Sequence, residues 1–141
     1  MKVSAKILAA SVLLASIAPA LSLESVTVTQ LATRTRTASG QPIALPQKDV
    51  RVIVSTYDIG PGASLPVHKH PFARYAYVQA GSIEVTQTET RESTVYKAGD
   101  FIVEMLDQWH SARNLSDETV KLLVIDQVEG EAQNTILHSH Q

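Results

Sequence analysis

The stretch GASLPVHKHPFARYAYVQAG, residues 62–81, carries the pattern that decides the fold. Apolar and polar residues alternate between two glycines, and His68 and His70 stand two positions apart. Residues two apart on a strand point to the same face, so this pair can direct both imidazoles at one cation. We therefore predict two strands, at residues 65–70 and 74–80, the first of which supplies part of a metal site.

Strand patterns continue on both sides of this stretch. Residues 50–59 alternate and are rich in β-branched side chains, and the turn Gly60-Pro61-Gly62 ends them. No amphipathic helix interrupts the pattern, and short strands at this spacing are typical of an antiparallel barrel or sandwich. The sequence thus predicts an all-β domain with further strands at residues 82–88, 93–97, 101–105, 109–114 and 120–126.

A third histidine, His110, follows the glycine turn at Gly99. Three imidazoles suit iron, nickel, zinc, copper or manganese, and a three-ligand arrangement leaves coordination positions open for water or substrate. The chain has no cysteine, so any metal must bind through nitrogen and oxygen. Pairs of the form His-x-His also occur on solvated strands, so the spacing alone leaves a metal site and a plain surface strand both open.

The spacing in residues 62–81 resembles the first signature of the cupins, G-x5-H-x-H-x3-E-x6-G. Gly62, His68, His70 and Gly81 match it, and Arg74 stands in the position of the glutamate. In cupins of known chemistry this glutamate usually donates an anionic oxygen to the metal. Arginine cannot take that role, because its guanidinium stays protonated and has no acceptor atom.

The second cupin signature, G-x5-P-x-G-x2-H-x3-N, is also present in part. Gly99, His110 and Asn114 match, whereas Met105 and Asp107 replace the proline and the second glycine. The resemblance implies an antiparallel jelly-roll β-barrel, commonly dimeric, with a metal held in its mouth by the three histidines. More narrowly, the chain resembles the small single-domain cupins of bacteria.

Arg74 leaves three hypotheses open. Metal binds the three neutral histidines and Arg74 clamps a substrate carboxylate, or Glu104 supplies the anionic ligand, or no metal binds and the barrel mouth takes an organic ligand directly. Strand parity alone places Glu104 opposite the more apolar face of residues 101–105 and points it away from the core, although a glycine turn or bulge can reset that parity. Arg74 could equally lie outside the barrel, paired with Glu84, and Trp109 could wall the pocket or fill the core.

The first 22 residues predict an export signal. Lys2 and Lys6 precede an apolar stretch that reaches Ala18-Pro19-Ala20, and we expect cleavage after Ala20 or Ser22. A retained anchor is the alternative, although residues 7–22 are short of the roughly 20 needed to span a bilayer. We expect a periplasmic or secreted protein with a signal peptide at 1–22, a strand at 25–30 and connecting arm within 23–49, a barrel at 50–128 and a flexible tail at 129–141.

Charge limits the partners. The 141 residues hold 12 Lys+Arg and 14 Asp+Glu, a formal net charge of -2, and loss of Lys2 and Lys6 with the signal leaves 10 against 14, or -4. This balance argues against nucleic acid and against an anionic membrane surface as partners, and we expect no stable membrane insertion after cleavage.

Two functions compete on this sequence. One is an exported cupin enzyme that binds a divalent metal through three histidines and acts on a small, anionic molecule as a dioxygenase or isomerase-like catalyst. The other is a non-catalytic periplasmic barrel, with or without metal, that binds or senses a small ligand. The sequence leaves open whether the protein is an enzyme, and a purely structural homodimer is a third reading. His138 and His140 repeat the His-x-His spacing, but they lie in the predicted tail.

Overall fold

The computed structural model describes residues 25–139, and those residues form strands and loops with no helix. The strand patterns of the sequence account for this, because alternate residues are less exposed along β1 and buried along β8. The strands are β1 (Val50–Ile59), β2 (Ser64–Lys69), β3 (Arg74–Ala80), β4 (Ser82–Gln87), β5 (Ser93–Lys97), β6 (Phe101–Val103), β7 (His110–Asn114), β8 (Val120–Glu129) and β9 (Ile136–Leu137).

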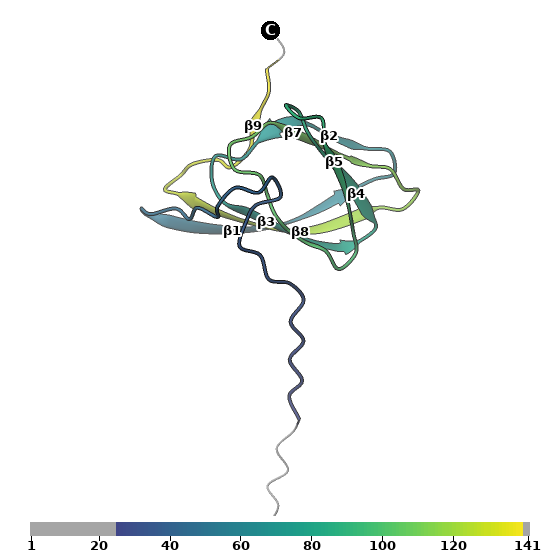
Figure 1. Cartoon of the computed structure of the whole chain (residues 1–141), viewed down its shortest axis with the longest axis horizontal. Coiled ribbons are helices and arrows are strands. Elements are labelled where there is room, and N and C mark those ends of the chain that lie inside the picture. The colour runs from purple at the N-terminus through teal and green to yellow at the C-terminus, as the bar shows by residue number, and fades with distance from the viewer. Residues whose placement is uncertain (1–24, 140–141) are drawn as a thin grey trace, which may run out of the picture.

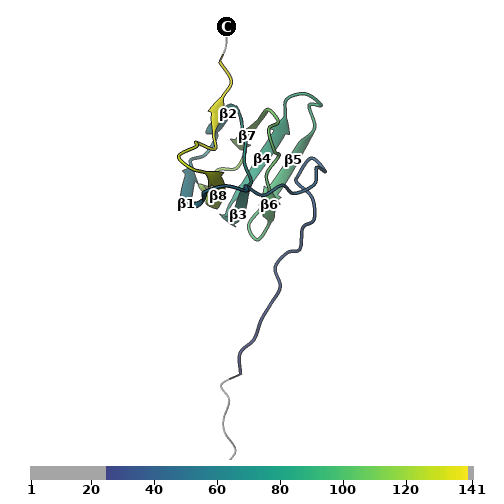
Figure 2. The same ribbon diagram turned by 90° about the vertical axis from the view of Figure 1, so that its left-hand side faces the viewer.

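Two antiparallel sheets face each other as the layers of the barrel (Figures 1 and 2). One sheet has the order β1-β8-β3-β6, and the other has the order β5-β4-β7-β2-β9. Successive strands therefore switch between the layers, except for the hairpin of β4 and β5, and all strand pairs are antiparallel. The predicted all-β, antiparallel jelly-roll barrel is confirmed.

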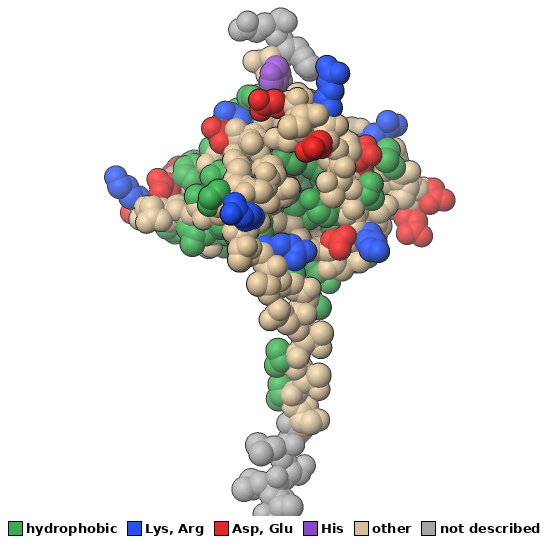
Figure 3. Space-filling model, in the orientation of Figure 1, with side chains coloured by type: hydrophobic (Ala, Val, Ile, Leu, Met, Phe, Trp, Pro, Cys, Tyr) green, Lys and Arg blue, Asp and Glu red, His purple; other side chains and the backbone are tan. Residues whose placement is uncertain are grey.

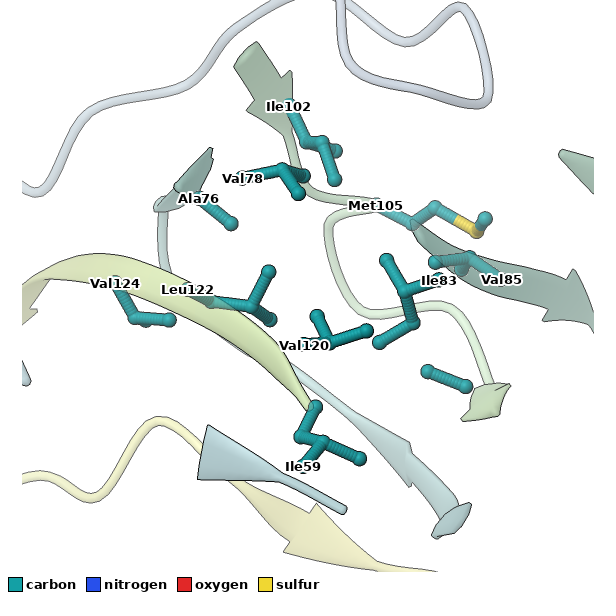
Figure 4. Close-up of a cluster of buried hydrophobic side chains, with 11 residues drawn as sticks. Ile59, Ala76, Val78, Ile83, Val85, Ile102, Met105, Val120, Leu122 and Val124 are labelled. Carbon is teal, nitrogen blue, oxygen red and sulfur yellow. The ribbon is translucent and has the colours of Figure 1, made fainter. Parts of the chain in front are cut away.

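The hydrophobic core fills the space between the layers. Figure 4 shows side chains from both sheets pointing toward one another, among them Val78, Ile83 and Val120. Val78 and Val120 are completely buried. Burial of each such side chain contributes about 1.5–3 kcal/mol relative to exposure. On the face shown in Figure 3, acidic and basic side chains are interspersed over the rim of this barrel.

The N-terminal segment differs from the prediction. Residues 25–30 alternate in sequence but form no strand, because no neighbouring strand offers them a hydrogen-bonding partner. Val26 and Val28 are each 86% exposed. The predicted signal peptide lies outside the described residues. Within residues 25–139, no helix is long and apolar enough to cross a membrane.

The segment after β8 is held against the barrel. β9 pairs with β2, and the His138 backbone N–H donates to the Val67 carbonyl at 2.9 Å. The sequence predicted a flexible, loosely attached tail from residue 129. Because of these contacts, the prediction of loose attachment is wrong for residues 129–138. The flexibility of the segment stays a prediction. A two-residue strand leaves too short an alternation to be seen in the sequence.

Asn114 holds the turn that ends β7. Its amide nitrogen donates to the carbonyls of Ile59 and Glu118 at 2.9 and 2.6 Å, and its amide oxygen accepts from the Ser116 backbone N–H at 2.9 Å. The side chain is fully buried. The sequence prediction that Asn114 satisfies backbone groups at a turn agrees with this arrangement.

Gly81 is expected to tolerate no side chain. A Cβ there would lie 3.1 Å from the Val120 Cα and 3.2 Å from the Thr119 carbonyl oxygen, and the residue has φ +74°. Gly62 has a similar φ of +70° but open space around it, so Gly62→Ala is a matched control. We expect Gly81→Ala to lower the free energy of unfolding by about 2–5 kcal/mol, and Gly62→Ala by about 1–2 kcal/mol, in urea titrations. Equal losses would show that the close contact does not matter.

Candidate metal centre

The three histidines of the predicted site meet inside the barrel. His68 lies on β2, His70 follows that strand directly, and His110 begins β7, the neighbour of β2. His68 and His110 are register partners across these strands. The three ring centroids are 4.4–5.0 Å apart, and one nitrogen from each ring lies within 4.8 Å of the others. The side chains are 6%, 1% and 2% exposed, so this cluster of nitrogen donors faces the interior and not solvent.

A backbone carbonyl fixes each imidazole in the same tautomer. The Nδ1 atoms lie 2.6 Å from the Pro66 carbonyl for His68, 2.6 Å from the Asn134 carbonyl for His70, and 2.8 Å from the Gln108 carbonyl for His110. A carbonyl oxygen can only accept, so we assign the proton to Nδ1 in all three rings. Each neutral ring is left with a lone pair on Nε2, the arrangement in which histidine binds a metal.

The site favours uncharged histidines. Burial lowers the pKa of all three rings, and burial together with the nearby Arg74 charge lowers the pKa of His70 to about 2. At neutral pH the three rings therefore stay neutral, which is the form that can coordinate a cation.

Glu104 adds a carboxyl group to this cluster. Its side chain is 13% exposed, and its Oε2 lies 3.8 Å from Nε2 of His110. Burial raises the pKa of Glu104, while the charge of Arg74 acts in the opposite direction. The three imidazole nitrogens suit a divalent transition metal, and the Glu104 carboxyl group lies beside one of them, on His110.

The prediction that Glu104 faces away from the core is wrong. Ile102 lies on the same face of the strand as Glu104 and is buried in the core. The sequence therefore assigned the two residues to the same face correctly, but it took the opposite face as the inner one. The other face of β6 carries apolar side chains as well, Phe101 and Val103, and Val103 is buried. Apolar residues therefore occur on both faces of β6, and hydrophobicity does not identify the inner one.

Arg74 is a buried member of an ion pair. Its Nε and Nη2 donate to the two carboxylate oxygens of Asp126 at 2.7 and 3.0 Å, across the register pair that joins β3 to β8. Burial opposes the charge, but the hydrogen bonds and charge of Asp126 outweigh it and raise the pKa of Arg74. The alternative of a surface arginine paired with Glu84 is wrong. Because Asp126 compensates its charge, Arg74 is not an unpaired clamp for an anion.

Two adjoining spaces lead to the histidines. The inner cavity has about 20 Å³ of room for the centres of water-sized molecules, and its lining includes the three histidines, Glu104 and Arg74. That is enough for an ion or a single water. The outer pocket, of about 230 Å³, shares part of this lining and could hold a small organic molecule. It is lined by Tyr57, Leu65, Pro66, His68, Arg74, Thr135 and Leu137.

Trp109 lines neither of these two spaces. Its ring contacts the Lys69 amine, 5.0 Å from the ring centroid, and the His138 ring, at a centroid distance of 4.8 Å. It lines a separate pocket with Asp107 and Gln108. The structure therefore gives no support to the prediction that Trp109 belongs to the ligand-binding wall.

Sequence reasoning missed two residues that support the site, Asp126 and Asn134. Asp126 had a usable signal, because it shares strand parity with Leu122 and Val124, which belong to the core, and a charged residue on an inward face needs a partner. Asn134 had none, since it lies in a polar stretch with no strand or helix pattern.

Stability without metal is expected to fall as the solution becomes acidic. In the unfolded chain His70 takes up a proton near pH 6.5, whereas in the folded protein its pKa is about 2. Below pH 6.5 the unfolded state therefore binds one more proton at this residue, and the free energy of unfolding drops by up to about 1.4 kcal/mol per pH unit. The raised pKa of Glu104 opposes this loss. Urea titrations of chelator-treated protein from pH 7 to 5 measure the slope.

His70→Gln is the matched variant for this pH experiment, because glutamine can donate to the Asn134 carbonyl but cannot be protonated. For this variant, the plot of the free energy of unfolding against pH is expected to be shallower than for the original protein, by up to about 1.4 kcal/mol per pH unit, which corresponds to one proton. Identical slopes would contradict the role of His70.

Comparison with known families and structures agrees with the fold. The family model Cupin_2, described as a cupin domain, matches residues 55–126, just over half of the 141 residues. No curated protein matches the chain.

Solved structures share the barrel at low sequence identity. The polyketide cyclase RemF from Streptomyces resistomycificus is 20% identical with a TM-score of 0.54, and the match covers 63% of each chain. The protein BH2720 from Bacillus halodurans is 20% identical with a TM-score of 0.52, over 63% of this chain and 70% of that one. An oxalate oxidase, solved with the substrate analogue glycolate, is 22% identical with a TM-score of 0.51, over 61% of this chain and 45% of that one. The chain thus spans less than two thirds of the cyclase and of the oxidase, and these likenesses concern the fold alone.

Proposed function

Because the chain belongs to the cupin domain family, we propose that it is a metal-dependent cupin enzyme acting on a small molecule. The metal is a divalent transition ion held by His68, His70 and His110, with Glu104 as the anionic ligand. One observation supports this most directly: each of the three rings has its Nδ1 committed to a carbonyl, so three Nε2 atoms remain available in one buried cluster.

Each part of the site has a separate role in this proposal. The bound metal supplies Lewis-acid or redox chemistry at its open coordination positions. The carbonyls hold the imidazoles neutral and oriented, and burial keeps bulk water away from them. Glu104 supplies the anionic oxygen beside His110, with its Oε2 3.8 Å from the His110 Nε2. The outer pocket binds the substrate through apolar contacts with Leu65 and Leu137.

An anionic substrate is our proposal within this class. Three neutral imidazoles and one carboxylate leave a divalent ion with a net positive charge, and the Arg74–Asp126 pair adds none. The donor set does not distinguish a dioxygenase from an isomerase-like enzyme, since both use open positions on a metal.

Metal content tests the proposed metal-dependent enzyme. Elemental analysis of protein purified without a polyhistidine tag is expected to find close to one transition-metal ion per chain, and His68→Ala is expected to lose it. Absence of metal from carefully purified native protein would contradict the proposal.

The second candidate is a non-catalytic barrel that binds or senses a small ligand. The small inner cavity favours it, because a bound substrate has little room beside the histidines. In that case a ligand would raise the unfolding temperature even after treatment with a chelator, by mass action on the folded state. A shift that disappears with the metal would favour the enzyme.

We also propose that the protein is exported to the periplasm or secreted. The support is the sequence of the first 22 residues, with its two lysines, apolar stretch and small residues. Mass spectrometry of the mature protein is expected to find an N-terminus at Leu21 or Leu23. An intact Met1 in the exported fraction would contradict cleavage.

A homodimer is the assembly that we propose. β1 is an edge strand of its sheet, and Val52 and Val54 on it are more than half exposed. An edge strand with exposed apolar side chains is suited to pairing with another chain. Light scattering is expected to give twice the mass of the chain, and a monomer at micromolar concentration would contradict this.

A further inference from the structure

Asn134 is buried in a segment whose flanking residues are exposed. It is 5% exposed, whereas Gln133 and Thr135 on either side face solvent. Its amide nitrogen donates to Asp126 Oδ1 at 2.6 Å, and its amide oxygen accepts from the Phe72 N–H at 2.8 Å. The side chain therefore ties the segment after β8 both to the buried ion pair and to the loop that follows His70.

The backbone of the same residue holds a candidate metal ligand. The carbonyl of Asn134 accepts from Nδ1 of His70 at 2.6 Å. His68 and His110 each use the carbonyl two residues before them in sequence, so their orientation is set locally. His70 instead depends on a carbonyl 64 residues away. Such a bond fixes the ring orientation and the tautomer of a metal-binding histidine.

The C-terminal segment, residues 130–138, reaches the site at further points. Thr135 Oγ1 accepts from Arg74 Nη2 at 3.1 Å, and Leu137 is the register partner of His68 in the β2–β9 pair. Thr135 and Leu137 also line the outer pocket. Figure 1 shows β9 beside β2 and β7 at the edge of the histidine-bearing sheet, where the chain leaves the barrel.

We propose that Asn134 is a positioning residue of the metal centre and that docking of the C-terminal segment is coupled to metal binding. The inference rests on the proposed three-histidine site. A metal on Nε2 of His70 needs the ring in the orientation that the Asn134 carbonyl sets, so a docked segment raises metal affinity. By thermodynamic reciprocity, bound metal stabilises the docked segment by the same factor.

Metal titration of side-chain variants tests the first half of this proposal. We expect Asn134→Ala to weaken Co²⁺ binding, followed by its visible absorption, by roughly 10–100-fold, because loss of the amide releases the carbonyl that orients His70. Gln133→Ala, at the exposed neighbour, is the matched control and is expected to bind Co²⁺ as the original protein does. Thr135→Val removes the contact with Arg74 and leaves Asn134 in place, so its effect is expected to be smaller.

Hydrogen exchange in the original protein tests the second half without any variant. The His138 N–H, which donates to the Val67 carbonyl, reports docking of the segment. Saturating Co²⁺ is expected to slow its exchange by about the factor by which Asn134→Ala weakens Co²⁺ binding. Exchange that does not respond to metal, or equal Co²⁺ affinity for Asn134→Ala and the original protein, would overturn the coupling while the metal site stands. Failure of the original protein to bind Co²⁺ at all would overturn the proposed function and this inference together.

Discussion

Replacing Arg74 with methionine is expected to lower the free energy of unfolding by about 3–5 kcal/mol. Arg74 and Asp126 are both buried and joined by two hydrogen bonds, and the nearby rings are neutral. Without the guanidinium, Asp126 keeps only the amide of Asn134 among the partners shown, which leaves a carboxylate uncompensated in the interior. Urea unfolding at pH 7, in the presence of a chelator, measures the loss apart from any metal effect.

The double variant with Asp126→Asn is the control for this prediction. Asparagine has nearly the same shape and can still accept from Asn134, but it carries no charge. Replacing both partners of a buried pair is far less costly than removing one, so the double variant is expected to recover at least half of the lost stability. If Arg74→Met alone costs less than about 1 kcal/mol, the pair is better solvated than its burial implies.

The Arg74–Asp126 pair also explains the departure from the cupin signature. Position 74 is where the signature has its glutamate, and here a guanidinium stands there with a carboxylate opposite it on β8. The carboxyl group nearest to the histidines comes instead from Glu104, just after β6. Glu104 is the neighbour of Arg74 across two paired strands, since β3 and β6 are paired and the Glu104 backbone N–H donates to the Arg74 carbonyl at 2.9 Å. A carboxyl group thus lies beside the histidines although the glutamate position of the signature holds an arginine.

The strands and the shared face of His68 and His70 could be predicted from the sequence because both follow from local alternation, whereas the meeting with His110 through the β2–β7 pairing was implied by the resemblance to the cupins. β1, β3 and β5 begin and end at the predicted residues, where turn residues bound a period-two pattern. His68 and His70 share a face for the same reason. The glycine at position 81 marks a left-handed turn at which a side chain would strike Val120.

The remaining features depend on contacts between distant segments, which no local pattern records. Glu104 lines the cavity although Phe101 and Val103, on the opposite face, are the apolar pair that the sequence favours as the inner face. Arg74 is buried because Asp126, 52 positions along the chain, is its register partner. Asn134 lies in a polar stretch that is typical of a loop, and its burial follows from partners on two other elements.

Removing the metal is expected to lower the free energy of unfolding by about 4 kcal/mol when the free metal had been held at 1,000 times its dissociation constant. The reason is mass action, since the metal binds the assembled histidines and not the unfolded chain. His110→Ala is expected to abolish the difference between metal-loaded and chelated protein. Arg113→Ala is the matched control, because Arg113 lies on β7 like His110 but is exposed and outside the cluster, and it is expected to retain the full difference. Thermal or urea unfolding of each variant with added Zn²⁺, and then with a chelator, measures these differences.

Glu104→Gln in the same experiment separates the three hypotheses that Arg74 leaves open. If Glu104 ligates, the glutamine variant is expected to bind metal at least about tenfold more weakly, which reduces the metal-dependent stabilisation by about 1.4 kcal/mol. The variant should also lose less stability as the pH rises above the ordinary carboxyl pKa in its metal-free form, because the buried carboxyl group that resists ionisation is gone. An unchanged metal effect would assign the metal to three histidines alone. No metal effect in the original protein would leave a barrel whose neutral histidines and Arg74–Asp126 pair serve an organic ligand directly.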